Sequence, residues 1–185
     1  SKHEPAHPLS HFLAAVADAK PAPAGGSVTA FVGALAASLG VMGARFAGQS
    51  DREQRLLELS RQLHQRVQTD AEAYNGLMDT YKIPKHHPDR HQVILIALQR
   101  ATEVPLEITE LSCEVARLLY ALREGAKPTL HSDLTVGLTL AIAAAKAGLV
   151  TANTNINDQQ NHKLIDSIRL RIVKATESLE ELRVL

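Results

Sequence analysis

A single carboxylate interrupts an otherwise apolar helical face near the middle of the chain. The spacing predicts a helix whose buried face carries residues three or four positions apart: Leu59, Leu63, Val67, Asp70, Tyr74, Leu77 and Tyr81. A carboxylate on such a face loses its hydration, so it must be paired, hydrogen-bonded or part of a site. Asp70 is therefore a candidate site residue, and a structural hydrogen bond to another helix is the alternative.

A glycine-rich segment forms a second candidate site. The prolines and glycines of the segment 21–26 exclude regular structure, and Ser27 is placed to cap the helix that follows. Free amides at a helix N-terminus attract anions, and glycine lets a ligand approach the backbone closely. The alternative is a plain loop that leads into a core helix.

The histidines and the cysteine give weaker indications of chemistry. His86, His87 and His91 surround a predicted loop, but no carboxylate or fourth ligand is fixed beside them. A solvated loop is therefore favoured over a metal site, and we expect no metal. The only cysteine, Cys113, excludes an intramolecular disulfide and fits a reducing compartment. Because the segment Ser1–Leu9 is polar and lacks a signal-peptide pattern, we expect a cytoplasmic protein.

The composition predicts one helical domain. The 185 residues are 45% hydrophobic but only 3% aromatic, and 20 basic residues balance 20 acidic ones. We expect a single domain over residues 1–185, with residues 1–8 as a flexible tail. A zero net charge argues against nucleic-acid binding. Glycine and serine interrupt the apolar runs, so no membrane span is expected.

Helical periodicity extends through the chain, and no segment alternates with a period of two. The sequence predicts an all-α fold, an antiparallel bundle of about six helices. A capping box at Ser50 and Glu53 and a cap at Ser132 and Asp133 mark two helix starts. The expected helices cover 9–19, 28–47, 50–82, 90–124 (kinked at Pro105 or divided there), 134–151 and about 158 to the C-terminal region. The second and fifth are rich in small residues and are expected to pack together.

Four segments, in order along the chain, resemble the cyclodeaminase/cyclohydrolase family. This family includes the cyclodeaminase half of formiminotransferase-cyclodeaminase and stand-alone methenyltetrahydrofolate cyclohydrolases. The likeness covers nearly the whole chain. The segments are PAPAGGSVTAFVGALAASLGVM, then Asp70-Ala71-Glu72-Ala73-Tyr74 with Ile83-Pro84-Lys85, then Ser132-Asp133, and finally Asn153-Thr154-Asn155-Ile156-Asn157.

The resemblance implies a helical bundle, usually a homodimer, that acts on a tetrahydrofolate derivative. It implies a methenyltetrahydrofolate cyclohydrolase, with a formiminotetrahydrofolate cyclodeaminase or a non-catalytic small-molecule binder as alternatives. Both reactions pass through a tetrahedral carbon between two nitrogens and require proton transfer. The resemblance makes Asp70 the expected acid/base catalyst. The expected substrate-binding residues are Gly25, Gly26, Ser27, Tyr74, Ser132, Asp133 and Asn153.

The sequence departs from the family pattern at two places. Ala24 stands where the family usually has the first of three glycines, and an alanine costs roughly 1 kcal/mol or more if that position needs a positive φ. Thr129, Leu130 and His131 occupy the space where the family commonly has an asparagine before its Ser-Asp pair. An altered or lost activity is therefore an open alternative.

Overall fold

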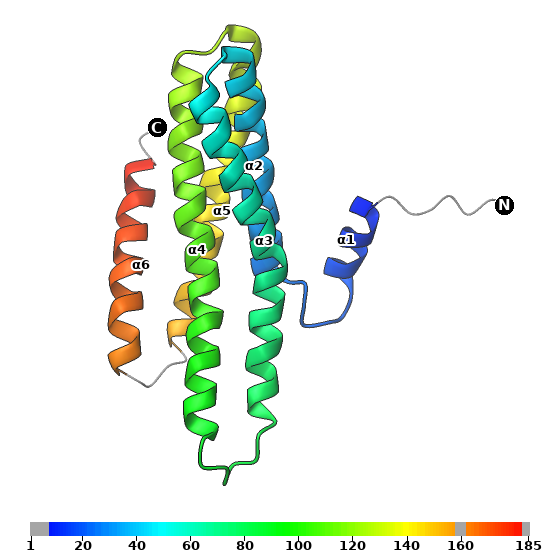
Figure 1. Ribbon diagram of the computed structural model, residues 1–185, viewed down its shortest axis with the longest axis vertical. Coiled ribbons are helices and arrows are strands. Elements are labelled where there is room, and N and C mark those ends of the chain that lie inside the picture. The colour runs from blue at the N-terminus through cyan, green and yellow to red at the C-terminus, as the bar shows by residue number, and fades with distance from the viewer. Residues whose placement is uncertain (1–7, 158–161, 183–185) are drawn as a thin grey trace, which may run out of the picture.

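The computed structural model shows a bundle of long antiparallel helices and describes residues 8–157 and 162–182 (Figure 1). These residues form six α-helices and one short 3-10 helix, with no strand among them, which confirms the predicted all-α fold. The elements are α1 (Pro8–Ala17), α2 (Gly25–Ala47), α3 (Ser50–Tyr81), α4 (Arg90–Glu124), η1 (Pro128–Leu130), α5 (His131–Asn157) and α6 (His162–Leu182). The expected flexible tail falls almost wholly outside the described residues.

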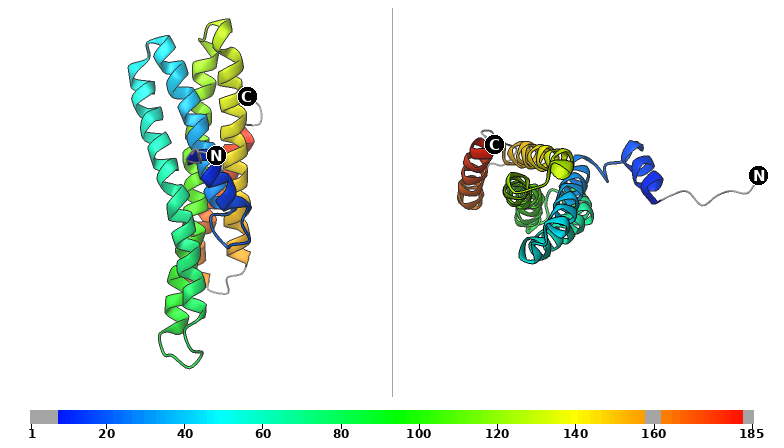
Figure 2. Two further views of the ribbon diagram at one scale, coloured as in Figure 1. Left: turned by 90° about the vertical axis from the view of Figure 1, so that its right-hand side faces the viewer. Right: turned by 90° about the horizontal axis from the view of Figure 1, so that it is seen from above.

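Four helices, α2 to α5, make the body of the bundle, and the other two lie outside it. Helix α6 packs on α4 and α5 (Figure 1). Helix α1 stands apart from the bundle and buries none of its residues (Figure 2). Its Phe12 ring lies 5.2 Å from the Phe31 ring of α2. The core therefore lies within the bundle body and beneath α6, whose Ile168, Leu179 and Leu182 are also buried.

Small residues on α2 and α5 let neighbouring helices come close to the backbone. A Cβ at Gly40 would lie 3.0 Å from the Leu56 side chain of α3, so that leucine fills the space above the glycine. A Cβ at Gly137 of α5 would lie 3.3 Å from the Leu39 Cβ of α2. The predicted packing of the two small-residue helices is thus confirmed, with leucines between them filling the core.

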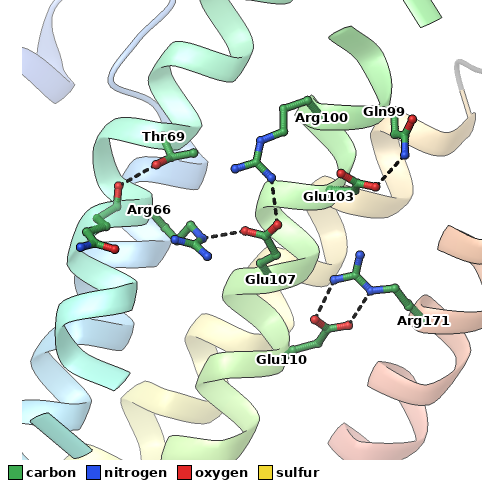
Figure 3. A network of polar contacts seen from close by, with 9 residues as sticks. Arg66, Thr69, Gln99, Arg100, Glu103, Glu107, Glu110 and Arg171 are labelled. Carbon is green, nitrogen blue, oxygen red and sulfur yellow. Dashed lines mark hydrogen bonds and ion pairs between the residues drawn. The ribbon is translucent and has the colours of Figure 1, made fainter. Parts of the chain in front are cut away.

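A row of carboxylates on α4 ties this helix to α3 and α6 (Figure 3). Glu107 accepts from Arg66 of α3 at 2.6 Å and from Arg100 at 2.9 Å. Glu110 accepts both guanidinium hydrogen bonds of Arg171, at 2.9 and 2.8 Å, and so anchors α6. These pairs are partly exposed, so each contributes modestly to stability and mainly fixes helix registry.

The predicted caps at Ser27 and Ser50 are wrong, because each serine lies within its helix and another residue occupies the N-cap position. Ser27 lies in the first turn of α2, which begins at Gly25 after Ala24. Ser50 begins α3, and its N-cap residue Gln49 makes no side-chain cap hydrogen bond. The rules for helix caps consider only hydrogen-bond partners that are close in sequence. The side chains of these serines have a partner on another helix or no partner among the described residues.

Both ends of α5 differ from those expected. Helix α5 begins at His131, so Ser132 and Asp133 lie inside it, and it continues through the asparagines to Asn157. Helix α4 runs from Arg90 to Glu124 through Pro105 as one helix, which was one of the two predicted alternatives. Packing on neighbouring helices keeps both segments helical where local propensity favours an end.

Candidate active site

A pocket of about 250 Å³ opens where the start of α2 meets α3, α4 and α5. Its walls bring together the proline-glycine segment, the acidic position of α3 and the C-terminal part of α5. The lining residues are Pro21, Ala22, Ala24, Gly25, Gly26, Asp70, Tyr74, Leu77, Ala101, Thr151 and Asn155. The pocket is mostly apolar with few polar groups, which is the usual character of a small-molecule site.

Among the described residues of the pocket wall, Asp70 is the only acidic one, and it faces the first turn of α2. The Ser27 hydroxyl donates to the Val67 carbonyl at 2.7 Å and lies 3.3 Å from Asp70 Oδ2. One hydroxyl proton serves both acceptors, and the shorter distance assigns it mainly to Val67. The Asp70 carboxylate is consequently half-buried without a strong ion pair, so it stays available for proton transfer.

Burial raises the pKa of the Asp70 carboxyl above its usual value, because the charged form loses hydration. Hydrogen bonds from the Ser27 hydroxyl and backbone N–H favour the charged form and partly offset this increase in pKa. A carboxyl whose pKa is moved toward neutrality exchanges protons more readily at physiological pH. The environment of Asp70 thus fits an acid or a base.

The backbone before α2 carries no strain at Ala24. Its φ of −133° lies in the extended region, which any residue adopts, so alanine in place of a glycine has no backbone penalty here. The Ala22–Pro23 peptide bond is cis. Ala24 and Gly25 both line the pocket, and this departure from the family pattern leaves the local conformation allowed.

Asn155 is a pocket residue that the sequence analysis did not select. Its Nδ2 donates to the Ala101 carbonyl of α4 at 2.8 Å, and both residues line the pocket. The signal that could have identified it is Pro105, four residues after Ala101, because a proline leaves that carbonyl without its helical donor.

The family model for formiminotransferase-cyclodeaminase matches residues 8–174 of this chain. The chain belongs to this family. The match includes every pocket residue, so the family assignment and the pocket concern the same part of the molecule.

Named members of the family resemble the chain over most of its length. A methenyltetrahydrofolate cyclohydrolase of Methylorubrum extorquens is 31% identical over 163 residues, which are 80% of this chain and 76% of that protein. The formimidoyltransferase-cyclodeaminase of Gallus gallus is 27% identical over 94% of this chain. The chain spans only 35% of the length of that chicken protein. The predicted family resemblance is thus confirmed.

A solved structure shares the fold. The crystal structure of formiminotetrahydrofolate cyclodeaminase from Thermotoga maritima matches with a TM-score of 0.86. The match covers 96% of this chain and 92% of that one at 23% identity. The helical bundle described above is therefore the fold of that cyclodeaminase.

Of the site residues that the family resemblance implied, the structure brings five together. Gly25, Gly26, Asp70 and Tyr74 line the pocket, and Ser27 lies directly behind Asp70. Tyr74 follows Asp70 by one helical turn and is partly exposed.

The other three expected residues lie elsewhere in this chain. Ser132 and Asp133 are exposed at the start of α5, and a rise of about 1.5 Å per residue places Asp133 roughly 33 Å from Asn155 along that helix. Asn153 is exposed and does not line the pocket. Ser132 and Asp133 could therefore reach a molecule in this pocket only from a second copy of the chain.

The histidines form no metal site in the part of the chain that is described. No group of three histidine, cysteine, aspartate or glutamate side chains there is close enough to hold an ion. His86, His87 and His91 are exposed in the loop between α3 and α4 and at the start of α4.

Proposed function

We propose that this protein is a methenyltetrahydrofolate cyclohydrolase, which adds water to the one-carbon bridge of 5,10-methenyltetrahydrofolate and opens the ring. The observation that carries this proposal is the half-buried Asp70 carboxyl in a pocket beside the start of α2. A likeness to a named cyclohydrolase over most of both chains supports the choice of reaction.

In this proposal Asp70 moves the protons. As a carboxylate it removes a proton from the water that attacks the bridging carbon, so that the new C–O bond forms on a neutral hydroxyl. As an acid it then gives this proton to N5 while the C–N5 bond breaks, and the hydroxyl proton leaves to solvent. The product is 10-formyltetrahydrofolate, and one proton is released overall.

The pocket accommodates only part of such a substrate. A volume of about 250 Å³ lies below the usual range for an entire drug-sized ligand. No lysine or arginine lines it among the described residues. The pterin ring and its one-carbon bridge are therefore assigned to the pocket, while the anionic glutamate tail lies outside.

The same pocket suits formiminotetrahydrofolate cyclodeaminase as a second candidate. There N10 attacks the formimino carbon, ammonia leaves, and the same carboxyl moves the protons. The shared fold with the Thermotoga maritima cyclodeaminase favours this alternative. Both reactions need one proton-transfer group beside a tetrahedral carbon, so the pocket alone does not separate them.

Two assays on the purified chain test the proposal. Loss of the methenyltetrahydrofolate absorbance, corrected for the rate without protein, measures the cyclohydrolase reaction. Ammonia release from 5-formiminotetrahydrofolate measures the cyclodeaminase reaction. Turnover only in the second assay would replace the first function by the second. Binding of 5-formyltetrahydrofolate with no turnover in either assay would show a non-catalytic binder.

We also propose that the protein is a homodimer whose interface includes the outward faces of α2 and α5. These neighbouring helices expose large apolar side chains, including Leu35 on α2 and Val136 and Val150 on α5. Both helices are as long and as apolar as helices that cross membranes, yet only 39% of the apolar stretch that includes α5 is buried within one chain. A second copy would cover this surface.

The exposed helix α1 supports the same association, since it buries none of its residues in one chain. It has ten residues, which is shorter than helices that are stable alone in water, and it exposes Leu13. Packing on a second copy would stabilise it.

We infer a cytoplasmic location from the cysteine. Burial raises the pKa of the Cys113 thiol to about 11, so this thiol stays protonated and unreactive. A lone, buried, reduced cysteine fits a reducing compartment.

A further inference from the structure

Pro105 leaves a carbonyl of α4 without its helical partner at the pocket wall. In an α-helix the N–H of each residue donates to the carbonyl four residues earlier, and proline has no N–H. The carbonyl affected by Pro105 is that of Ala101, which lines the pocket. Asn155 of α5 replaces the missing donor, with Nδ2 2.8 Å from the Ala101 oxygen.

The approach of α5 to α4 brings Asn155 to this carbonyl. Gly148 packs on the proline turn, since a Cβ there would lie 2.7 Å from the Pro105 carbonyl oxygen. Thr151 and Asn155 follow Gly148 by three and seven residues, so all three lie on one stripe of α5. The close contact at Gly148 therefore fixes the position of α5 along its axis and its rotation about that axis, and so determines where Asn155 reaches the pocket.

The hydrogen bond to Ala101 fixes the orientation of the Asn155 amide. A carbonyl oxygen only accepts, so the nitrogen of the amide must point at Ala101. The Oδ1 atom is then the free end of the amide, and it has no hydrogen-bond partner among the residues described. An amide oxygen with a fixed direction in a pocket wall is a preorganised acceptor.

We propose that Asn155 orients the substrate, with its Oδ1 accepting an N–H of the pterin ring. This inference rests on the proposed function, because the pterin supplies the donor. Asn155 holds the ring from the wall of α4 and α5, while Asp70 acts from α3. Pro105 is a positioning residue, since it frees the carbonyl that holds the amide.

Three variants test this arrangement: Asn155→Ala, Pro105→Ala, and the two combined. Asn155→Ala removes the acceptor and should weaken binding of 5-formyltetrahydrofolate by about ten-fold, the scale of one hydrogen bond. Pro105→Ala restores the N–H to Ala101 and releases the Asn155 amide, so binding should weaken by a smaller factor. In the double variant Ala101 has a helical donor again, which removes the unsatisfied carbonyl as a cause of misfolding.

The double variant decides whether the two residues act together. If Pro105 acts only through Asn155, the double variant binds no more weakly than Asn155→Ala alone. If the losses of affinity of the two single variants multiply in the double variant, Pro105 does not act through Asn155 and its positioning role is overturned. Thr154→Ala is the matched control, because its exposed hydroxyl bonds only to Val150 of its own helix. Unchanged binding in Asn155→Ala, with normal turnover in the unmodified protein, would overturn the role of Asn155 while the proposed function stands.

A measurement without folate distinguishes a failure of the proposed Asn155 anchoring from a failure of the proposed function. The side-chain amide protons of Asn155 should exchange slowly with water in the unmodified protein and rapidly in Pro105→Ala, as seen by NMR. Rapid exchange in both would overturn the anchoring of Asn155 whatever the substrate. If the unmodified protein neither binds nor turns over a folate, the proposed function fails and the pterin contact fails with it.

Discussion

Gly26 lies directly against the carboxylate of Asp70, so closely that a Cβ at Gly26 would overlap the carboxyl group. The first turn of α2 and the middle of α3 meet at this point, and only a residue without a side chain permits the contact. The glycine therefore serves close approach rather than an unusual backbone angle, since no positive φ occurs there.

Gly26→Ala should displace the Asp70 carboxyl and lower activity. The added methyl group forces either the carboxyl or the start of α2 to move, and a shift of about 1 Å at a catalytic group can cost on the order of a hundred-fold in rate. Steady-state kinetics with a thermal melt measures the effect. Gly76→Ala is the matched control, because a Cβ at Gly76 meets nothing within 4 Å. Full activity in Gly26→Ala would contradict the assigned position of Asp70.

Asp70→Asn tests the proposed proton transfer. The substitution keeps the shape of the side chain but removes its charge and most of its capacity to exchange protons. If Asp70 is the acid/base group, kcat should fall by about two to four orders of magnitude. Stability should change little or increase, since a half-buried charge is removed. A strongly destabilised variant that keeps its specific activity would indicate a structural role instead.

The pH dependence of stability gives a separate test of Asp70. Burial raises its pKa in the folded protein, so the folded state holds this proton more tightly than the unfolded state does. The stabilising contribution of Asp70 is therefore greatest below its unfolded pKa of about 3.9 and is lost as the pH rises through the folded pKa.

Asp70→Asn has no such titration, so its stability relative to the unmodified protein should increase from acidic to neutral pH. Urea unfolding of both proteins at several pH values measures the difference, in which the other carboxyl groups cancel. A difference that decreases with rising pH would mean that the folded protein lowers the pKa of Asp70.

The helices were predictable because periodic burial is encoded locally, and the ends of α3 and α4 agree with those expected. The start of α2 and both ends of α5 were not predictable in this way. Asp70 stood out from the sequence because it occupies a position on the apolar face of a long helix. In the structure its side chain is half-buried, which agrees with that position. Ser27 was read as a cap because its local sequence is typical of one. Its actual acceptor, the Val67 carbonyl, comes from another helix, and no rule about neighbouring residues includes it.

The asparagines near the end of α5 show a second limit. The family resemblance favoured Asn153, but Asn155 is the one that reaches the pocket. Two residues along a helix correspond to a rotation of about 200°, so the choice depends on which face of α5 meets α4. The contacts of Gly148 with the Pro105 turn determine that face, and they exist only in the folded bundle.

The exposed faces of α2 and α5 lead to a prediction about assembly. Light scattering at micromolar concentration should give about twice the 20.0 kDa mass of one chain, because Val136 and Val150 leave an apolar stripe that a second copy can cover.

Val150→Glu should shift the protein toward the monomer, since 66% of this side chain is exposed in one chain and a charge would then be buried at the interface. Val173→Glu on α6 is the matched control, because Val173 is also exposed but lies away from α2. A monomer in the unmodified protein would overturn the dimer, and equal dissociation in both variants would overturn the assignment of the interface to α5. If the unmodified protein instead binds lipid vesicles and loses this binding in Val150→Glu, the stripe faces a membrane rather than a second copy.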